Sequence, residues 1–209
     1  MKIGIIGSGG RIGSALLQLL AGSCTVIPCS SPHCNGDTIE RSDFTFLCVP
    51  ETETLKILNK TEHPERCIEV TSVKTPMTKF AGKIVSIHPL FGPKTAGRRE
   101  YMNIVFVSDL SIPGSRNTIE ALFPEYRIIE MTSSEHDKFM LSQIVFPYLV
   151  SILQKRQPDP LTYSARMLDQ LRNLVDSESR DVVRDNILMN PYIADLSASI
   201  MQILENPVW

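Results

Sequence analysis

The sequence lacks a long apolar run. No stretch reaches the roughly 18 consecutive apolar residues that a membrane-spanning helix needs, and the apolar segment 1–6 is too short for a signal peptide. A basic stripe is missing as well, because 21 Lys and Arg residues are scattered among 23 Asp and Glu residues, for a net charge of −2. We therefore predict a cytoplasmic protein that binds neither membranes nor nucleic acid.

Cysteine pairs of the C-x-x-C type are also missing. Cys24, Cys29 and Cys34 are evenly spaced, but only His33 lies close to them among the residues that bind transition metals. We interpret the cysteines as reduced thiols near a sheet and predict no metal site.

Strand-like and helix-like segments alternate over residues 1–131, in a chain whose 43% hydrophobic content can form a sizeable core. This alternation is typical of an open, mainly parallel α/β sheet, so we predict a doubly wound Rossmann-type domain at 1–131. The predicted strands are 2–7, 25–28, 44–49, 67–71, 83–87, 103–108 and 126–131. The predicted helical segments are 11–21, 51–59, 75–80 and 115–123.

After residue 131 the pattern becomes helical. The segment 132–135 (Thr-Ser-Ser-Glu) fits a capping box, and apolar residues then recur at helical spacing. No further strand pattern follows, so we predict a smaller all-helical domain at 132–209. A segment of that size does not easily bury a core of its own.

A glycine-rich turn follows the first predicted strand. It consists of Gly7, Ser8, Gly9, Gly10, Arg11, Ile12 and Gly13. A strict G-x-G-x-x-G is not present, but the glycines at 7, 10 and 13 permit a tight turn and a close approach of backbone to phosphate. Because a helix begins here, its positive end would face the phosphates. We predict that this turn binds the pyrophosphate of a nicotinamide dinucleotide.

The acidic residue that would bind the adenosine ribose is missing from the end of the second strand. Ser30 and Ser31 lie there instead, and their small side chains leave room for a 2′-phosphate, with Arg11 or Arg41 as its counter-charge. This favours NADP over NAD, although either remains open. Val49 and Pro50, at the end of the third strand, are further predicted cofactor contacts.

Three other segments carry residues suited to chemistry: 71–74 (Thr-Ser-Val-Lys), 88–93 (His-Pro-Leu-Phe-Gly-Pro) and 135–137 (Glu-His-Asp). The first two follow predicted strands, at the sheet edge where ligands bind. Together with the glycine turn, their order and spacing over about residues 1–150 resemble the prephenate dehydrogenases and their arogenate-using relatives. The resemblance weakens after residue 150, where Arg172 and the segment 184–187 are still similar to family elements.

The resemblance implies oxidative decarboxylation of prephenate to 4-hydroxyphenylpyruvate, or of arogenate to tyrosine, with hydride transfer to NAD(P). It assigns His88 as the base on the ring hydroxyl, a role that suits an imidazole at neutral pH. Ser72 would reach the same hydroxyl or the nicotinamide. Because aromatisation drives the loss of carbon dioxide, no metal is required.

The resemblance also assigns substrate contacts. A dicarboxylate substrate requires a cation, and Arg172 is favoured, with Arg184 or Arg166 as alternatives. The other expected contacts are Thr95, Lys74 and Tyr148; many family members have a histidine in place of Tyr148. His136 and Asp137 are expected at the domain interface, and the helical domain is expected to form a homodimer, as in related enzymes.

Two other functions remain open. One is a different hydroxy-acid or imine reductase of the same two-domain plan, although its catalytic lysine would have to be Lys138, which lies close to the start of its helix. The other is a regulatory protein that binds the dinucleotide without catalysis.

Overall fold

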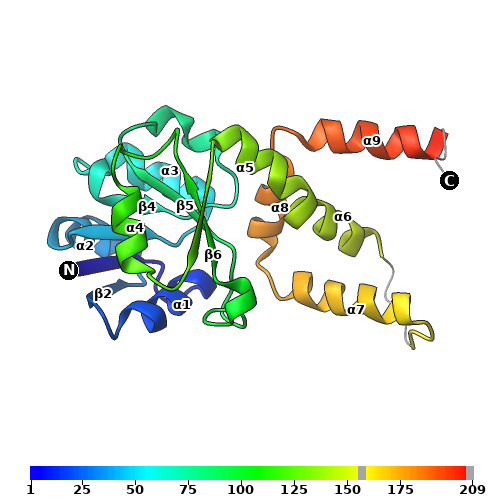
Figure 1. Cartoon of the computed structure of the whole chain (residues 1–209), viewed down its shortest axis with the longest axis horizontal. Helices are drawn as coiled ribbons and strands as arrows, with labels where there is room; N and C mark the ends of the chain where they lie inside the picture. Colours follow the sequence, from blue (N-terminus) through cyan, green and yellow to red (C-terminus); the bar gives the residue numbers. More distant parts are fainter. Residues whose placement is uncertain (155–158, 206–209) are drawn as a thin grey trace. The chain divides into compact units, whose positions relative to one another are not determined.

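The computed structural model describes residues 1–154 and 159–205, and the chain divides into two compact units, Met1–His136 and Asp137–Trp209 (Figure 1). The predicted change from α/β to helical character after residue 131 falls between the last strand and the helix α5 (Ser133–Met140), within which the two units meet along the chain.

The described residues of the first unit form a seven-stranded sheet with the order β2-β1-β3-β4-β5-β6-β7. Neighbouring strands are parallel except β5 and β6, which are antiparallel. The strands are β1 (Lys2–Ile6), β2 (Thr25–Cys29), β3 (Phe44–Leu47), β4 (Cys67–Glu69), β5 (Val85–Pro89), β6 (Asn103–Val107) and β7 (Arg127–Met131). The prediction of a mainly parallel, Rossmann-type sheet is confirmed.

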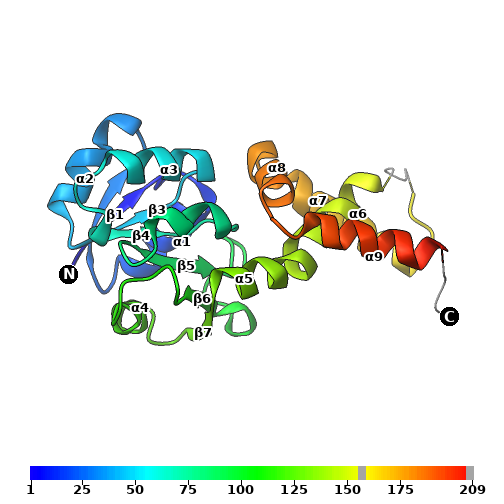
Figure 2. The same ribbon diagram turned by 90° about the horizontal axis from the view of Figure 1, so that it is seen from above.

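Alternation along the strands builds a separate apolar core on each face of the sheet. Ile3 and Ile5 point to the face covered by helices α1 and α4, whereas Ile6 points to the face covered by α2 and α3. Figure 2 shows these helices around the sheet. The helical segments are α1 (Arg11–Leu20), η1 (Pro32–Cys34), α2 (Asn35–Arg41), α3 (Glu51–Lys60), η2 (Pro64–Arg66), η3 (Thr75–Phe80), η4 (Arg99–Tyr101) and α4 (Arg116–Leu122).

Helix α2 was not among the predicted elements. Its sequence, Asn-Gly-Asp-Thr-Ile-Glu-Arg, has one large apolar residue and begins with an Asn-Gly pair that is typical of turns. It forms nevertheless because Thr38 and Ile39 are buried against the sheet. Tertiary packing therefore outweighs a weak local preference.

The interpretation of all cysteines as reduced thiols is wrong for two of them. Cys29, the last residue of β2, and Cys34, in η1, are joined by a disulfide. Cys24, Cys48 and Cys67 are free thiols, and burial raises the pKa of both Cys48 and Cys67, which makes them poor nucleophiles. The even spacing of the three cysteines does not distinguish the pairs, but the turn after β2 brings only Cys29 and Cys34 together.

Opening the disulfide is expected to destabilise the first unit. The bridge closes a short loop, with a sequence separation of 5, so Cys34→Ser should lower the free energy of unfolding by about 2 kcal/mol through the entropy regained by the unfolded chain. Urea denaturation of this variant, with Cys24→Ser as the matched control, measures the effect. An equal loss in both variants would refute a stabilising role for the bridge.

The described residues of the second unit, 137–154 and 159–205, contain helices as their regular elements. A π-helical segment (Leu141–Val145) joins α5 to α6 (Phe146–Leu153), and it precedes Pro147, whose missing N–H prevents regular α-helical pairing. The remaining helices are α7 (Tyr163–Asp176), α8 (Arg180–Leu188) and α9 (Ile193–Glu205). Within the described part of the chain, no helix is both long and apolar enough to cross a membrane.

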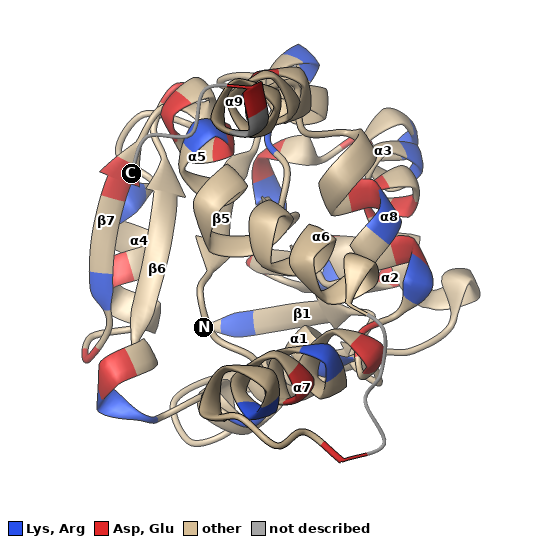
Figure 3. Ribbon diagram, turned by 90° about the vertical axis from the view of Figure 1, so that its right-hand side faces the viewer, with Lys and Arg blue, Asp and Glu red and all other residues tan. Residues whose placement is uncertain are grey.

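Charged residues of both signs are interspersed over the helices and strands (Figure 3). This distribution agrees with the scattered basic residues of the sequence.

Candidate active site

The glycine turn connects β1 to α1 by a route that only glycine permits. Gly7 has a φ of +81°, and a Cβ at this position would lie 2.2 Å from the Cys48 carbonyl oxygen. A Cβ at Gly13 would lie 2.1 Å from the carbonyl oxygen of Gly7, so this glycine lets the first turn of α1 sit directly on the loop. The predicted roles of Gly7 and Gly13 in the turn therefore have a direct steric basis.

Gly9 differs from these two glycines because it faces open space. Its nearest neighbour would be the Ser30 Cβ, 3.9 Å from an added Cβ. The backbone N–H groups of Gly7 and Ser8 donate to the Cys29 carbonyl oxygen, at 2.8 and 3.1 Å, which fixes the turn against the end of β2. The turn is thus exposed on the side where the start of α1 offers backbone N–H groups, an arrangement that suits a pyrophosphate.

Adding a methyl group at Gly9 should impair dinucleotide binding without affecting the fold. Because a Cβ there meets no protein atom closer than 3.9 Å, Gly9→Ala should keep the melting temperature and weaken NAD(P) binding by roughly tenfold or more. Fluorescence titration measures the affinity, and Gly36→Ala, at another open glycine, is the matched control. Unchanged affinity in Gly9→Ala would mean that the phosphates do not approach this turn.

Neither proposed counter-charge for a 2′-phosphate lies at the end of β2. Arg41 ends α2, which leads into the amino end of β3 at the opposite edge of the sheet, and it pairs with Asp37 at 3.1 Å. Arg11 Nη2 lies 3.9 Å from where a Cβ of Gly92 would be, after β5, whereas β2 is on the other side of β1. The only remaining support for NADP is therefore the small size of the Ser30 and Ser31 side chains.

The predicted site residues of the first unit follow parallel strands and therefore share one sheet edge. The residues concerned are Gly7–Gly10 after β1, Ser30 and Ser31 after β2, Val49 and Pro50 after β3, Ser72 after β4, and His88 at the end of β5. Arg11 bridges two of these loops, because its side chain extends from the start of α1 towards Gly92. The strand order changes direction at β1, between β2 and β3, which is where dinucleotides bind in such sheets.

His88 is buried, with 6% of its surface exposed, and its ring contacts a second histidine. His88 Nδ1 lies 2.9 Å from Nε2 of His136, which is in α5 and fully buried. Burial lowers the pKa of His88 well below its usual value of 6.5, and the nearby His136 and Lys74 lower it further. His88 is consequently neutral at physiological pH and able to accept a proton.

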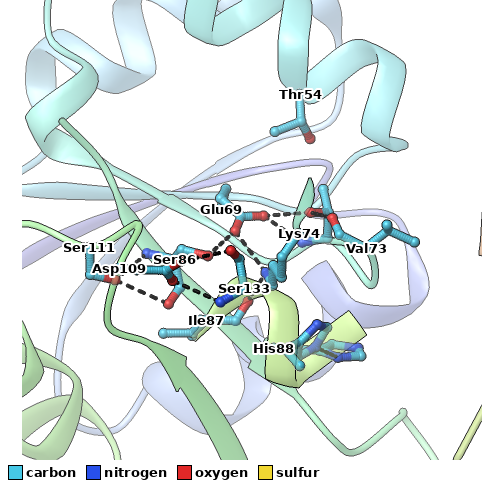
Figure 4. Close-up of polar contacts among 12 residues, drawn as sticks. Thr54, Glu69, Val73, Lys74, Ser86, Ile87, His88, Asp109, Ser111 and Ser133 are labelled. Atoms are coloured by element: carbon cyan, nitrogen blue, oxygen red, sulfur yellow. Dashed lines mark hydrogen bonds and ion pairs between the residues drawn. The ribbon is translucent and has the colours of Figure 1, made fainter. Parts of the chain in front are cut away.

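Lys74 does not lie where a substrate could reach it, which corrects its predicted role. Its side chain is fully buried, and Nζ donates at 2.7 Å to both Glu69 Oε1 and the Ile87 carbonyl oxygen (Figure 4). Glu69 Oε2 also accepts from the Thr71 backbone N–H at 2.9 Å and from its hydroxyl at 2.6 Å. Lys74 therefore fixes the loop that carries Ser72 to the strand that carries His88.

Glu69 itself was missed by the sequence analysis. It is the last residue of β4 and fully buried, and besides Lys74 and Thr71 it accepts a hydrogen bond from the hydroxyl of Ser86 on β5. A signal was present, since an acid in the apolar run Cys-Ile-Glu-Val, followed five residues later by a lysine, is typical of a buried ion pair.

Ser72 and Thr95 occupy loops of the first unit. Ser72 is half-buried in the loop between β4 and η3. Thr95 closes the turn after β5, where its hydroxyl accepts from the Gly92 backbone N–H at 2.9 Å. Thr95 thus shapes this turn, and its predicted contact with a substrate carboxylate stays a prediction.

Arg172 and Tyr148 belong to the second unit. The Arg172 guanidinium donates to the carbonyl oxygens of Ser151 and Gln154, at 2.8 and 3.1 Å, and pairs with Asp176 at 3.0 Å. Within its unit, Arg172 therefore joins α7 to the end of α6. Tyr148 is half-buried on α6, and the substrate-binding roles of both residues stay predictions.

Three other basic residues of the second unit are candidates for a functional role: Arg184, Arg166 and Lys138. Arg184 pairs with Asp181 and Asp185, whereas Arg166 donates to the Pro160 carbonyl oxygen. The Lys138 ammonium lies 5.0 Å from the centre of the Tyr192 ring, a cation–π contact that gives this lysine a structural partner.

Comparisons with known proteins bear on the fold. No protein-family model and no curated protein matches the sequence. Among solved structures, the chain is similar to prephenate dehydrogenase from Aquifex aeolicus, in complex with hydroxyphenyl propionate and NAD+, with a TM-score of 0.74 and 13% identity over 98% of this chain and 88% of that chain. It is also similar to Synechocystis arogenate dehydrogenase, with a TM-score of 0.56 and 18% identity over 98% of this chain and 92% of that chain.

At these identities the comparisons establish the fold alone, which is of the Rossmann type that these solved structures share.

Proposed function

We propose that the protein is a prephenate or arogenate dehydrogenase, which oxidises and decarboxylates its substrate with NAD(P). The observation that carries this proposal is the position of the neutral, buried His88 on the same sheet edge as the glycine turn. The similarity to solved prephenate and arogenate dehydrogenases supports it, as does the order of the Ser-Val-Lys and His-Pro segments in the sequence.

The residues at the carboxyl edge fit a nicotinamide dinucleotide. Gly9 leaves space above the turn, the start of α1 can receive the pyrophosphate, and Val49 and Pro50 border the turn on the β3 side, with Val49 Cγ1 3.0 Å from where a Gly7 Cβ would be. When bound, the dinucleotide supplies the hydride acceptor. The region around Ser30 determines the preference between NAD and NADP. Because β2 has no acidic residue at its end to bind the adenosine ribose, NADP is the proposed cofactor.

His88 supplies the base. As hydride leaves the ring carbon, the hydroxyl on that carbon becomes strongly acidic, so even an imidazole of lowered pKa can take its proton. Ser72 would hydrogen-bond the same hydroxyl and orient it. The carboxylate then departs as carbon dioxide because the ring becomes aromatic, and this step needs no acid from the protein.

A turnover assay tests this proposal. The protein is incubated with prephenate or arogenate, each with NAD and with NADP, and the absorbance of reduced nicotinamide is followed. We expect turnover with at least one pair. No turnover with any of the four pairs, in protein that binds the dinucleotide, would refute the proposal and favour the regulatory alternative.

The second unit is proposed to form a homodimer. Large apolar side chains among its described residues are exposed, including Leu153, Leu161, Tyr163 and Leu188, with exposed fractions of 70% to 82%. An exposed apolar surface of this kind is typical of a protein interface, and a second copy of the chain is the proposed partner.

Charged residues on α7 should prevent this association. Met167 and Leu174 are seven residues apart, so they lie on one face of the helix, and both are about half exposed. Met167→Glu/Leu174→Glu should convert a dimer to a monomer in light scattering, whereas Asn173→Glu, at an exposed polar position about 100° around the same helix, should not. A wild-type protein that is monomeric at micromolar concentration would contradict the dimer.

A further inference from the structure

The contact between His88 and His136 has a consequence for how His88 can act. The two rings meet edge to face, with centroids 5.1 Å apart, and the nitrogens in contact are His88 Nδ1 and His136 Nε2, at 2.9 Å. Both side chains are buried, and both belong to the first unit. One nitrogen of each ring is therefore committed to the other ring.

The direction of this hydrogen bond decides which nitrogen of His88 is basic. A neutral imidazole carries one proton, so if His136 donates, the His88 proton must be on Nε2, and His88 has no lone pair left for a substrate. If His88 donates from Nδ1, its Nε2 has a free lone pair. Only the second arrangement allows His88 to accept a proton from a ligand.

We infer that His136 is a positioning residue, which accepts a hydrogen bond from His88 Nδ1 and thereby holds Nε2 of His88 as the proton acceptor of the reaction. This inference rests on the proposed function for the identity of the proton donor, a substrate hydroxyl. The hydrogen bond keeps its direction when Nε2 becomes protonated, so no reorientation accompanies proton transfer. The logic is that of a base oriented by an acceptor on its second nitrogen.

An acceptor without negative charge also suits the charges around His88. The Lys74 ammonium, from the loop after β4, binds the carbonyl oxygen of Ile87, the residue next to His88. Glu69, on β4 itself, pairs with that ammonium. A carboxylate in place of His136 would favour protonated His88. The imidazole of His136 fixes the tautomer without this effect, so His88 remains unprotonated at neutral pH.

The tautomer can be measured without substrate or cofactor. The chain contains four histidines, and the other two, His33 and His63, are exposed and half-buried respectively, so the imidazole ¹⁵N spectrum of the full chain should be simple to assign. We expect His88 to carry its proton on Nδ1 in the wild type and to shift towards the Nε2 tautomer in His136→Leu. His63→Leu is the matched control and should leave His88 unchanged. A wild-type His88 with its proton on Nε2 would overturn the inference.

Kinetics provide a second readout that a purely structural role would not change. His136→Leu should lower kcat by roughly a hundredfold with little change in the KM for substrate or cofactor, because the productive tautomer becomes rare. His136→Gln, which offers an amide oxygen as acceptor, should recover to within about tenfold of the wild type. Equal losses in both folded variants, or no loss in either, would overturn the inference.

The role of His136 can be tested even if the proposed function is wrong. If the wild type turns over no substrate, the proposed function fails, and the ¹⁵N spectrum still decides the direction of the hydrogen bond. If His136→Leu does not fold, as judged by circular dichroism, the comparison of His136→Gln with the wild type in the same spectrum decides it.

Discussion

Replacing His88 by asparagine should lower kcat by roughly a thousandfold, equivalent to about 4 kcal/mol of transition-state stabilisation. Asparagine retains a polar side chain at the end of β5 but cannot accept a full proton, so the substrate hydroxyl would lose its base. Steady-state rates with the substrate pair that the wild type turns over measure the effect. Full activity in this variant would mean that another residue is the base.

The matched measurement is cofactor affinity. His88 is the next-to-last residue of β5, whereas the glycine turn follows β1, with β3 and β4 between these two strands, so NAD(P) binding to His88→Asn should match the wild type. A parallel loss of affinity and rate would assign His88 to cofactor binding instead of proton transfer.

The pH dependence of kcat/KM is an independent test of the protonation state of His88. Because burial lowers the pKa of His88 below 6.5, the active, neutral form persists as the pH falls through 6.5, and is lost only below the lowered pKa. The acid limb of kcat/KM should therefore lie below the range of an ordinary histidine. An acid limb at or above pH 6.5 would contradict a neutral His88 in the free protein.

Removing the buried lysine is the second change with a large expected effect. Lys74→Met leaves the fully buried Glu69 carboxylate without its cation, which should lower the free energy of unfolding by about 3–5 kcal/mol. The loop that carries Ser72 would also lose its attachment to the Ile87 carbonyl oxygen, so activity should fall in the fraction that remains folded. Chemical denaturation of the full chain measures the loss.

Two further variants show whether the loss comes from the buried charge. Lys74→Met/Glu69→Gln should be more stable than Lys74→Met, because it removes the unpaired carboxylate, while its amide oxygen can still accept from Thr71 and its amide N–H can donate to the Ser86 hydroxyl oxygen. Arg41→Met breaks an exposed pair with Asp37 and should cost less than about 1 kcal/mol. If Lys74→Met were as mild as Arg41→Met, the buried pair would not hold the site together.

Sequence patterns predicted the positions of all seven strands and of the helices α1, α3 and α4, because buried parallel strands are short apolar runs that end in glycine or polar residues. The same reasoning placed the glycine turn, Ser72 and His88 at one edge, since the carboxyl ends of parallel strands share that edge. These predictions depend on local sequence pattern and on a general rule of sheet topology.

The remaining features depend on contacts between residues distant in the sequence. The burial of Lys74 beside Glu69 requires the register of β4 against β5, and the pairing of His88 with His136 joins residues 48 positions apart. The Cys29–Cys34 bridge depends on how η1 turns after β2. Residue types and spacing therefore identified the chemistry-bearing groups, but they did not show which of these groups face each other and which are structural.

The stoichiometry of the reaction tests the central claim most directly. With prephenate or arogenate and the preferred dinucleotide, the protein should release one molecule of carbon dioxide for each reduced nicotinamide formed, because hydride loss and decarboxylation occur on the same ring. Reduced nicotinamide without carbon dioxide would identify a different dehydrogenase, and dinucleotide binding without either product would contradict an enzymatic role for the His88 site.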